Sequence, residues 1–457
     1  MSWYKIEDQK RIGRYDKFQR YYDNEFTTAE KQALRTDSVY YISPNIIKSI
    51  VEITPDFLFG ETPRISAKQQ DLVDEIINST NFCTLFYQAA LTGSLKGDSV
   101  IKLYKHNNMI KAQLVQPENF FPTYNIMGEI SSVVFATVVD TDESYNYLLR
   151  EEITDKEITR KLFKCDKKKN DIIGEVTDEI QKTKLMGSLP DKEVNQLNVI
   201  PVIHIPNLLA PISSFWGISD LYGCDELILA INKRISEIDY ILTKHADPKL
   251  QVPEGILDKK QVIDAIQYTN GDIAAHVTVD GLDNQEFKVI EKAPNEAEMK
   301  YVQPNLDMTA AFDELKFLTD RLLNATKTSP SLIYNNTDGG QAESAKALKM
   351  RMQDTERKLR QKKAFFNKAI KEFFSIAFRL MNATEEIVDV EFVDLLNDTD
   401  TNIDRAVKLY EKGLISHREA LRVSYPNTDE SVIEDMLKEI ELEKLEDKLQ
   451  SNIDNDN

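Results

Sequence analysis

Cationic side chains gather in one stretch of this sequence, where they could bind a polyanion. Between Glu343 and Arg379 there are eleven lysines and arginines against four acids, a local balance of +7. The whole chain carries a formal charge of −19, so the remainder sums to −26. Because lysine and arginine neutralise phosphates, this stretch is where the sequence indicates a nucleic-acid partner. The alternative is a solvated helix face with scattered charges, which is the commoner meaning of a charge run.

A single long helix must position these charges. No proline or glycine occurs from Glu343 to Met381, and the pattern there is helical. Lys346 and Lys349 are three residues apart and would share a face of the first turn. With Arg351, they are the candidates for facing phosphates.

A polar segment leads into that helix. It follows the breaker Ser329-Pro330 and holds two adjacent glycines, each of which costs a helix roughly 1 kcal/mol. With little to bury, the segment should be irregular and mobile, as ligand-contacting loops are. Its residues are Asn335, Asn336, Thr337, Asp338, Gly339, Gly340 and Gln341.

Recognisable patterns for catalysis, metal binding or nucleotide binding are missing from the sequence. The run Gly93-Ser94-Leu95-Lys96-Gly97-Asp98 matches neither G-x-x-x-x-G-K-[ST] nor G-x-G-x-x-G, and a helix C-cap followed by a strand explains it better. The five histidines are dispersed without zinc spacing, and G-x-S-x-G is absent. We therefore expect no enzyme activity, no catalytic residue, no metal and no cofactor, although a site made only of carboxylates would not show in such patterns.

Composition limits the class of protein. With 457 residues, 41% of them hydrophobic, the chain can form two to four domains with real cores. Three distant cysteines offer no disulfide framework and indicate a reducing compartment during assembly. No apolar run approaches the ~20 residues that span a bilayer, and the amino terminus lacks the apolar core of a signal peptide, so we expect a soluble protein without membrane contact. The charge of −19 argues against wrapping nucleic acid over the whole surface.

The first 215 residues alternate between helix and strand patterns, which predicts an α+β fold. A helix opens after Pro44 and is closed by Thr54-Pro55 and by Phe57-Leu58-Phe59-Gly60. Two more helices follow, at about 69–77 and 82–91, and the second is expected to stop at Gly93. The period then changes to two, and strands are predicted at 100–104, 111–115, 133–139, 145–151, 159–163 and 199–205.

Two long amphipathic helices bracket a compact insert in the middle of the chain. The first runs from Ser219 to about His245 and ends at Asp247-Pro248, and the second covers about 305–324. Between them, turn signals separate strands at 274–279 and 287–290 and a short helix near 262–267. This order suggests a stalk with a knob on its end.

The carboxyl-terminal part returns to short elements. A strand is predicted at 387–392 and a helix at 406–412, capped by Gly413. The run Ser416-His417-Arg418-Glu419 has the form of a capping box that starts another helix. From 429 to 457, eleven acids and three lysines surround an apolar stripe, which predicts a surface helix that frays.

Four paired stretches carry a resemblance to a known family. They are Asn45 to Val51 with Phe57 to Pro63, Gly93 to Tyr104 with Pro117 to Pro122, Ile200 to His204 with Gly217 to Leu221, and Ser344 to Lys349 with Gly413 to Ser416. In this order, spanning most of the chain, they resemble the portal proteins of tailed bacteriophages, in the branch typified by the SPP1 portal. One departure is Ser344-Ala345, where relatives often show Ser-Gly, and alanine there should stiffen the exit from the loop.

The resemblance implies a homo-oligomeric ring, usually of twelve subunits, at one vertex of the capsid. Double-stranded DNA would enter through its channel during packaging and leave during ejection, with residues 335–341 facing the DNA. The implied portal-type subunit has an α/β wing, a long-helix stem, a small α/β clip, a tunnel loop with a long helix, and a helical crown. Their ranges are wing 1–215 with 382–402 returning to it, stem 216–246 and 297–329, clip 247–296, tunnel loop 330–343, long basic helix 344–381 and crown 403–457.

The resemblance also implies partners. The clip would dock the large terminase subunit, which supplies ATP hydrolysis, and later the head-to-tail adaptor, with Lys259, Lys260 and Asp264 as candidate contacts. Major capsid and scaffolding proteins would surround a ring assembled in the host cytoplasm and retained in the virion. An acidic wall would repel phosphates while a few cations near the constriction steady the DNA. Lys346 and Lys349 have an alternative role, pairing with acids at a subunit boundary.

Two other classes of function stay open from the residues. One is a cellular, non-enzymatic nucleic-acid-binding scaffold that uses the basic helix 343–379 as a monomer or dimer. The other is an unrecognised hydrolase. Ring formation separates the portal from both, and substrate turnover separates the hydrolase.

Overall fold

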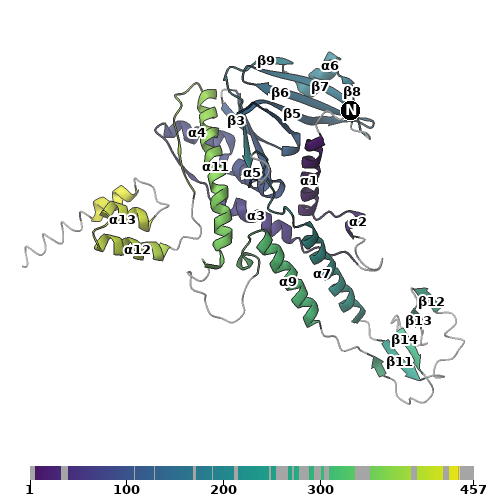
Figure 1. The fold of residues 1–457 in the computed structure, drawn as a ribbon. Coiled ribbons are helices and arrows are strands. Elements are labelled where there is room, and N and C mark those ends of the chain that lie inside the picture. The colour runs from purple at the N-terminus through teal and green to yellow at the C-terminus, as the bar shows by residue number, and fades with distance from the viewer. Residues whose placement is uncertain are drawn as a thin grey trace, which may run out of the picture. The chain divides into compact units, whose positions relative to one another are not determined.

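The described part of the chain forms two compact units. The computed structural model describes residues 6–31, 40–107, 109–127, 129–167, 171–187, 189–209, 215–245, 249–253, 266–269, 272–276, 288–292, 300–302, 308–334, 350–392, 399–425, 432–440 and 442. The first unit comprises Met1–Tyr22, Ile47–Tyr222 and Lys327–Asn457, and the second comprises Asp23–Ile46 and Gly223–Thr326. Helices and strands occur in both (Figure 1), which confirms the α+β class. Among the helices described, none is both long and apolar enough to cross a membrane.

Four helices come first in the chain of the first unit. They are α1 (Ile6–Tyr22), α3 (Ile46–Phe59), α4 (Gln70–Thr80) and α5 (Phe82–Lys96). The predicted closure of α3 at Thr54-Pro55 is wrong, because the helix continues to Phe59 with both residues buried. Burial in the core therefore offsets the backbone hydrogen bond that a proline removes. The stop predicted at Gly93 is also wrong: α5 runs to Lys96 and is capped by Gly97, whose φ of 106° is one that glycine adopts readily.

Two antiparallel sheets follow in the first unit. The smaller has the order β10 (Val202–Pro206), β2 (Asp98–His106), β3 (Met109–Val115). The larger has the order β4-β5-β6-β7-β8, with β9 also paired to β7. Its strands are β4 (Phe120–Tyr124), β5 (Ile130–Thr141), β6 (Tyr145–Thr154), β7 (Glu157–Asp166), β8 (Ile172–Glu175) and β9 (Lys192–Val194). All six strands predicted in this half are confirmed.

Short elements complete these sheets. The turn η1 (Pro117–Asn119) precedes β4, and helix α6 (Glu179–Met186) packs its Met186 against Tyr147 and Leu162 of the larger sheet. The strand predicted at 387–392 is confirmed as β16 (Asp389–Glu391), which pairs with β1 (Arg64–Ser66). Residues more than 300 positions apart are thus hydrogen-bonded neighbours.

The core of the first unit is built on one helix, α11 (Gln353–Leu380), which Figure 1 shows beside α4 and α5. The ring of Phe373 lies edge-on to those of Phe82 and Phe86, with centroids 5.6 and 5.4 Å apart. Strands β2 and β10 contribute aliphatic residues to the same cluster. Met350 and Arg351 are helical but separated from α11 by a turn at Met352, so the described part of the long basic helix is not continuous.

The carboxyl-terminal helices of this unit begin with α12 (Thr399–Glu411) and α13 (His417–Ser424), and residues 432–440 are helical as well. Gly413, at φ 66°, follows α12 as predicted. The predicted helix start is confirmed, since Ser416 is the N-cap of α13 and its Oγ accepts a hydrogen bond of 3.2 Å from the Glu419 N–H.

The second unit contains the predicted pair of long helices, α7 (Asp225–His245) and α9 (Thr309–Ala325), together with the short α2 (Thr28–Lys31). Helices α7 and α9 lie side by side (Figure 1), and Arg234 Nη2 is 2.6 Å from Glu314 Oε1. The start predicted for α7 at Ser219 is wrong, because the helix begins at Asp225.

Five described strands lie between these helices in the chain and form one sheet in the order β12-β13-β14-β11-β15. They are β11 (Lys249–Pro253), β12 (Ile266–Thr269), β13 (Asp272–His276), β14 (Lys288–Lys292) and β15 (Lys300–Val302). β13 and β14 confirm the two predicted strands. The helix predicted near 262–267 is wrong for Ile266 and Gln267, which belong to β12, and its other residues lie outside the described ones.

Candidate channel segment and its base

Most of the candidate site residues lie outside the described part of the chain. Residues 335–341, Lys346 and Lys349 fall in the stretch 335–349, and Lys259, Lys260 and Asp264 fall in 254–265. Their roles therefore stay predictions. Arg351 is described: it is exposed and lies just before α11.

The two ends of the candidate channel segment are tied together. The turn η2 (Pro330–Leu332) precedes the segment, and α11 follows it. Thr355 Oγ1 accepts a hydrogen bond of 2.8 Å from the Ser329 N–H and lies 3.1 Å from the Lys327 carbonyl, to which it donates. Thr355 and Ser329 are 0% and 4% exposed. The buried Thr355 hydroxyl therefore connects Lys327 and Ser329, which precede the stretch 335–349, to the helix that follows it. We call these contacts the base of the candidate channel segment.

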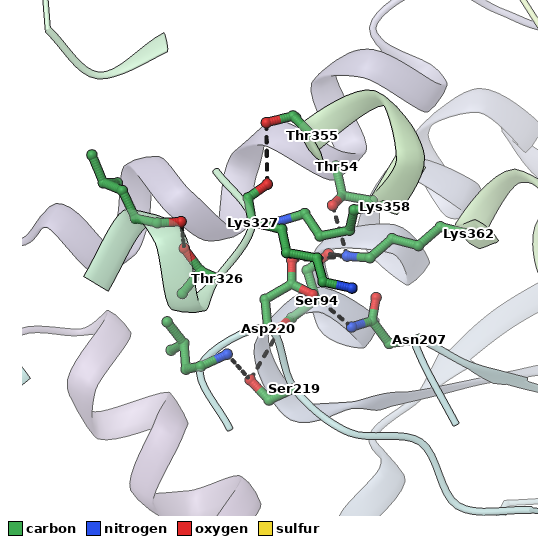
Figure 2. Close-up of polar contacts among 12 residues, drawn as sticks. Thr54, Ser94, Asn207, Ser219, Asp220, Thr326, Lys327, Thr355, Lys358 and Lys362 are labelled. Atoms are coloured by element: carbon green, nitrogen blue, oxygen red, sulfur yellow. Dashed lines mark hydrogen bonds and ion pairs between the residues drawn. The ribbon is translucent and has the colours of Figure 1, made fainter. Parts of the chain in front are cut away.

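The next turns of α11 carry two buried lysines. Lys362 Nζ lies 2.8 Å from Asp220 Oδ2, and Lys358 Nζ lies 3.4 Å from the same oxygen (Figure 2). Lys362 also donates to Thr54 Oγ1 at 2.8 Å and to Ser94 Oγ at 3.1 Å. The side chains of Asp220 and Lys362 are 0% exposed, and that of Lys358 is 2% exposed. We call Asp220, Lys358 and Lys362 the buried ion cluster.

The electrostatics of the buried ion cluster follow from its burial. Burial acts to raise the pKa of Asp220, but the ammonium groups of Lys358 and Lys362 and hydrogen bonds from Lys362 and Asn207 hold that pKa below its ordinary value. Burial lowers the pKa of Lys362 to about 8, with Asp220 opposing this change and Lys358 adding to it. The carboxyl group therefore stays ionised at neutral pH, bound to the two lysines.

Two glycines allow Asp220 to reach this position. Gly97 ends α5, and Gly217 approaches it so closely that a Cβ on Gly217 would lie 2.0 Å from the Gly97 carbonyl oxygen. The Asp220 N–H then donates to the Ser94 carbonyl at 3.0 Å, and Asn207 Nδ2 donates to Asp220 Oδ1 at 2.9 Å. Within the run Gly93 to Asp98, Gly97 is the C-cap of α5 and Asp98 starts β2, so the predicted C-cap and strand entry are present after the last turn of the helix.

A second buried polar cluster adjoins this turn. Asp98 Oδ2 accepts a hydrogen bond of 2.5 Å from Tyr15, while its Oδ1 lies 2.7 Å from His204 Nε2 and 2.8 Å from the Gly217 N–H. Burial and the Asp98 carboxylate raise the pKa of Tyr15 well above its ordinary value. Because Tyr15, Asp98 and the His204 side chain are all less than 5% exposed, these contacts fix α1 and the 217–220 turn to the β2–β10 sheet.

The basic-helix interpretation is corrected for two residues. Lys358 and Lys362 were counted among the cations available to a polyanion, but both lie in the core. On the outer side of α11, Arg357 pairs with Asp354 at 3.4 Å and Arg360 pairs with Glu356 at 2.8 Å. Sequence reasoning missed the cluster, although one signal was present: Thr355, Lys358 and Lys362 continue the apolar stripe of Phe366 and Phe373 at helical spacing.

Comparison with known proteins identifies the family. The model of the family described as phage portal protein, SPP1 Gp6-like, matches residues 2–446. The chain therefore belongs to this family, and the sequence resemblance is confirmed. Its role is that of a phage portal protein. The family is a structural one rather than a family of enzymes.

Solved structures show a weaker likeness. One, described as the neck of a native GTA particle computed with C12 symmetry, is 12% identical with a TM-score of 0.45, over 82% of this chain and 88% of that one. Another, described as the virion of a native gene transfer agent particle, is 10% identical with a TM-score of 0.45, over 87% and 98%. Because both TM-scores lie below 0.5, the family assignment rests on the family match. No curated protein sequence matches the chain.

Proposed function

We propose that this portal subunit assembles into a closed ring of twelve copies around a channel for double-stranded DNA. The helices α7 and α9 form the stem, residues 247–296 form the clip, and residues 335–341 line the channel. The wing 1–215 with 382–402 and the crown 403–457 complete the subunit, surrounded by major capsid and scaffolding proteins.

The exposed apolar side chains of α7 and α9 carry the proposal. Ile241 and Leu242 near the end of α7 are 39% and 44% exposed, and Phe312 and Phe317 on α9 are 50% and 54% exposed. Both helices are already packed side by side within the subunit. Large apolar side chains left exposed on packed helices indicate a further protein surface, and in a homo-oligomer the neighbouring copy supplies it.

Charge introduced on this surface tests ring formation. Leu242→Glu combined with Phe312→Glu should reduce assembly to small species at micromolar concentration, because each subunit interface would bury two carboxylates. Ile126→Glu is the matched control, since Ile126 is fully exposed in the turn before β5. Light scattering and particle images give the size. A full-size ring from the double variant would contradict the stem assignment, and a monomeric parent protein would contradict the ring.

The channel segment is supported by its closed base and by charge. Ser329 and Thr355 hold the flanks of the stretch together, so residues 335–341 can project as one loop. Lys346→Glu with Lys349→Glu should leave rings intact but impair DNA translocation, more strongly at low salt, where repulsion is least screened. Arg357→Glu is the control, because Arg357 is exposed on α11 and paired with Asp354. Packaging equal to that of the parent across ionic strengths would mean that the two lysines do not face DNA.

The clip is supported by the pairing of its ends. β11 and β15 are antiparallel neighbours, with Gln251 opposite Lys300, so the residues between them can be removed and the strands joined by a short turn. The large terminase subunit and the adaptor dock there, with Lys259, Lys260 and Asp264 as candidate contacts. A deletion of 254–298 should give rings that no longer bind terminase, and packaging by the deleted ring would refute the assignment.

A further inference from the structure

The chain passes between the two units four times, and the last two of these passages, which we call the first and the second passage, lie next to α11 contacts. It leaves the first unit after Tyr222 and returns to it at Lys327. Asp220, two residues before the first passage, is bound by Lys358 and Lys362 of α11. Lys327, at the second passage, accepts a hydrogen bond from Thr355 of α11 through its carbonyl. One helix therefore holds the chain on either side of the Gly223–Thr326 segment of the second unit.

The three α11 residues act from one face. Thr355, Lys358 and Lys362 are spaced by three and four, the spacing that aligns side chains on a helix. All three are at most 2% exposed. The same Thr355 hydroxyl binds the Ser329 N–H, which lies six residues before the candidate channel segment. This face therefore meets the first passage, the second passage and the base of the segment within about two turns of helix.

The charges of the buried ion cluster determine how the contact at the first passage responds to displacement. Two ammonium groups share a single carboxylate, and Thr54, Ser94 and Asn207 around them are neutral. Ion pairs buried in this way add little net stability, because desolvation offsets their attraction. They do penalise displacement, since any separation leaves a buried charge without its partner. Such a contact fixes a position more than it stabilises a fold.

We infer that the buried ion cluster and Thr355 form a positioning latch that ties both passages to α11 and fixes the residues on either side of the candidate channel segment, Ser329 and the start of α11. Asp220 and Lys362 are then positioning residues of the portal, acting on the segment through α11 without touching DNA. This inference deepens the proposed channel function and rests on it.

A neutral variant removes the ionic contact while keeping its volume. In the assembled ring, Asp220→Asn with Lys358→Met and Lys362→Met leaves no charge to bury, so the fold is retained. Amide hydrogen exchange should quicken about 10- to 100-fold in peptides covering 215–222, 327–334 and 353–362, the loss expected for charged hydrogen bonds. The matched control makes the same types of change on the exposed side of the helix: Asp354→Asn, Arg357→Met and Arg360→Met.

The positions of the peptides in which hydrogen exchange quickens decide whether the latch is supported. Faster exchange confined to these three stretches, with loss of DNA translocation by intact rings, supports the latch. Exchange unchanged from the control, or raised equally in the 145–166 strands, overturns it. If the neutral variant does not fold, Thr355→Val removes the hydrogen bonds of Thr355 with Ser329 and Lys327 instead. Its control is Thr355→Ser, which retains the hydroxyl. Unchanged hydrogen exchange at 327–334 in Thr355→Val overturns the latch. If the exchange result holds but substitutions at 335–341 leave translocation intact, the proposed channel role fails and the latch stands.

Discussion

Replacing Asp220 with asparagine is the sharpest test of the buried ion cluster. The change keeps the size and shape of the side chain, but it replaces one acceptor oxygen with an NH2 donor and removes the charge that Lys358 and Lys362 share, at 3.4 and 2.8 Å. All three side chains are at most 2% exposed, so water cannot replace the lost carboxylate. Removing one partner of a buried pair costs about 3–5 kcal/mol. Against a typical stability of about 5–15 kcal/mol, this is a large fraction.

The pH dependence of this loss has a definite sign. The pKa of Lys362 is about 8 in the folded protein, below its ordinary value of 10.5, so the free energy of unfolding of the parent rises as pH increases from about 8 to 10.5. The Asp220 charge raises that pKa, so Asp220→Asn lowers it further. Lys362 of the variant then loses its proton at a lower pH than Lys362 of the parent. The destabilisation should be largest at about pH 6 and smaller at about pH 9.

The assay is denaturant unfolding at fixed protein concentration, since ring assembly makes the apparent stability depend on concentration. The matched control is Asp354→Asn, whose side chain is 76% exposed, and it should change stability by less than about 0.5 kcal/mol. Adding Lys358→Met and Lys362→Met to Asp220→Asn should recover most of the loss. If Asp220→Asn behaves like the control at both pH values, the cluster does not hold an ionised carboxylate and the reasoning is wrong.

Two further predictions concern backbone features. Gly217→Ala should abolish soluble protein or lower its melting temperature sharply, because the added Cβ would lie 2.0 Å from the Gly97 carbonyl oxygen, whereas Gly174→Ala, with open space around it, should be tolerated. Ser416→Ala should destabilise α13 by about 1 kcal/mol through loss of the cap to the Glu419 N–H, seen as faster hydrogen exchange there, and Ser416→Asp should retain protection. Normal melting of Gly217→Ala, or unchanged exchange in Ser416→Ala, would contradict these assignments.

Much of the fold could be predicted because local patterns specify it. Alternation identified the strands, and Ser416 with Glu419 identified a helix start, since both signals depend only on neighbouring residues. Helix ends were less accurate where packing outweighs local preference. Pro55 and Gly93 are weak helix residues, yet α3 and α5 continue through them because both helices are buried in the core.

The buried ion cluster could not be predicted from spacing. Asp220 is 138 and 142 residues from its two lysines, and no local pattern pairs residues so far apart. Counting charges along α11 also treated every lysine as exposed, although the apolar stripe already placed Lys362 on the core side. The candidate residues in 335–349 and 254–265 remain predictions, because they lie outside the described part of the chain.

The burial and pairing of the basic residues between Glu343 and Arg379 affect how strongly the proposed channel could bind passing DNA. Two of the eleven cations between Glu343 and Arg379 are buried, and Arg357, Arg360 and Arg379 are paired with neighbouring acids. Each phosphate contact by a free lysine or arginine adds salt-dependent affinity that a moving strand must break. Lys358 and Lys362, which are buried against Asp220, cannot retain DNA in this way. α11 therefore exposes fewer cations than its sequence contains, which agrees with the proposal that DNA slides through the portal without strong binding.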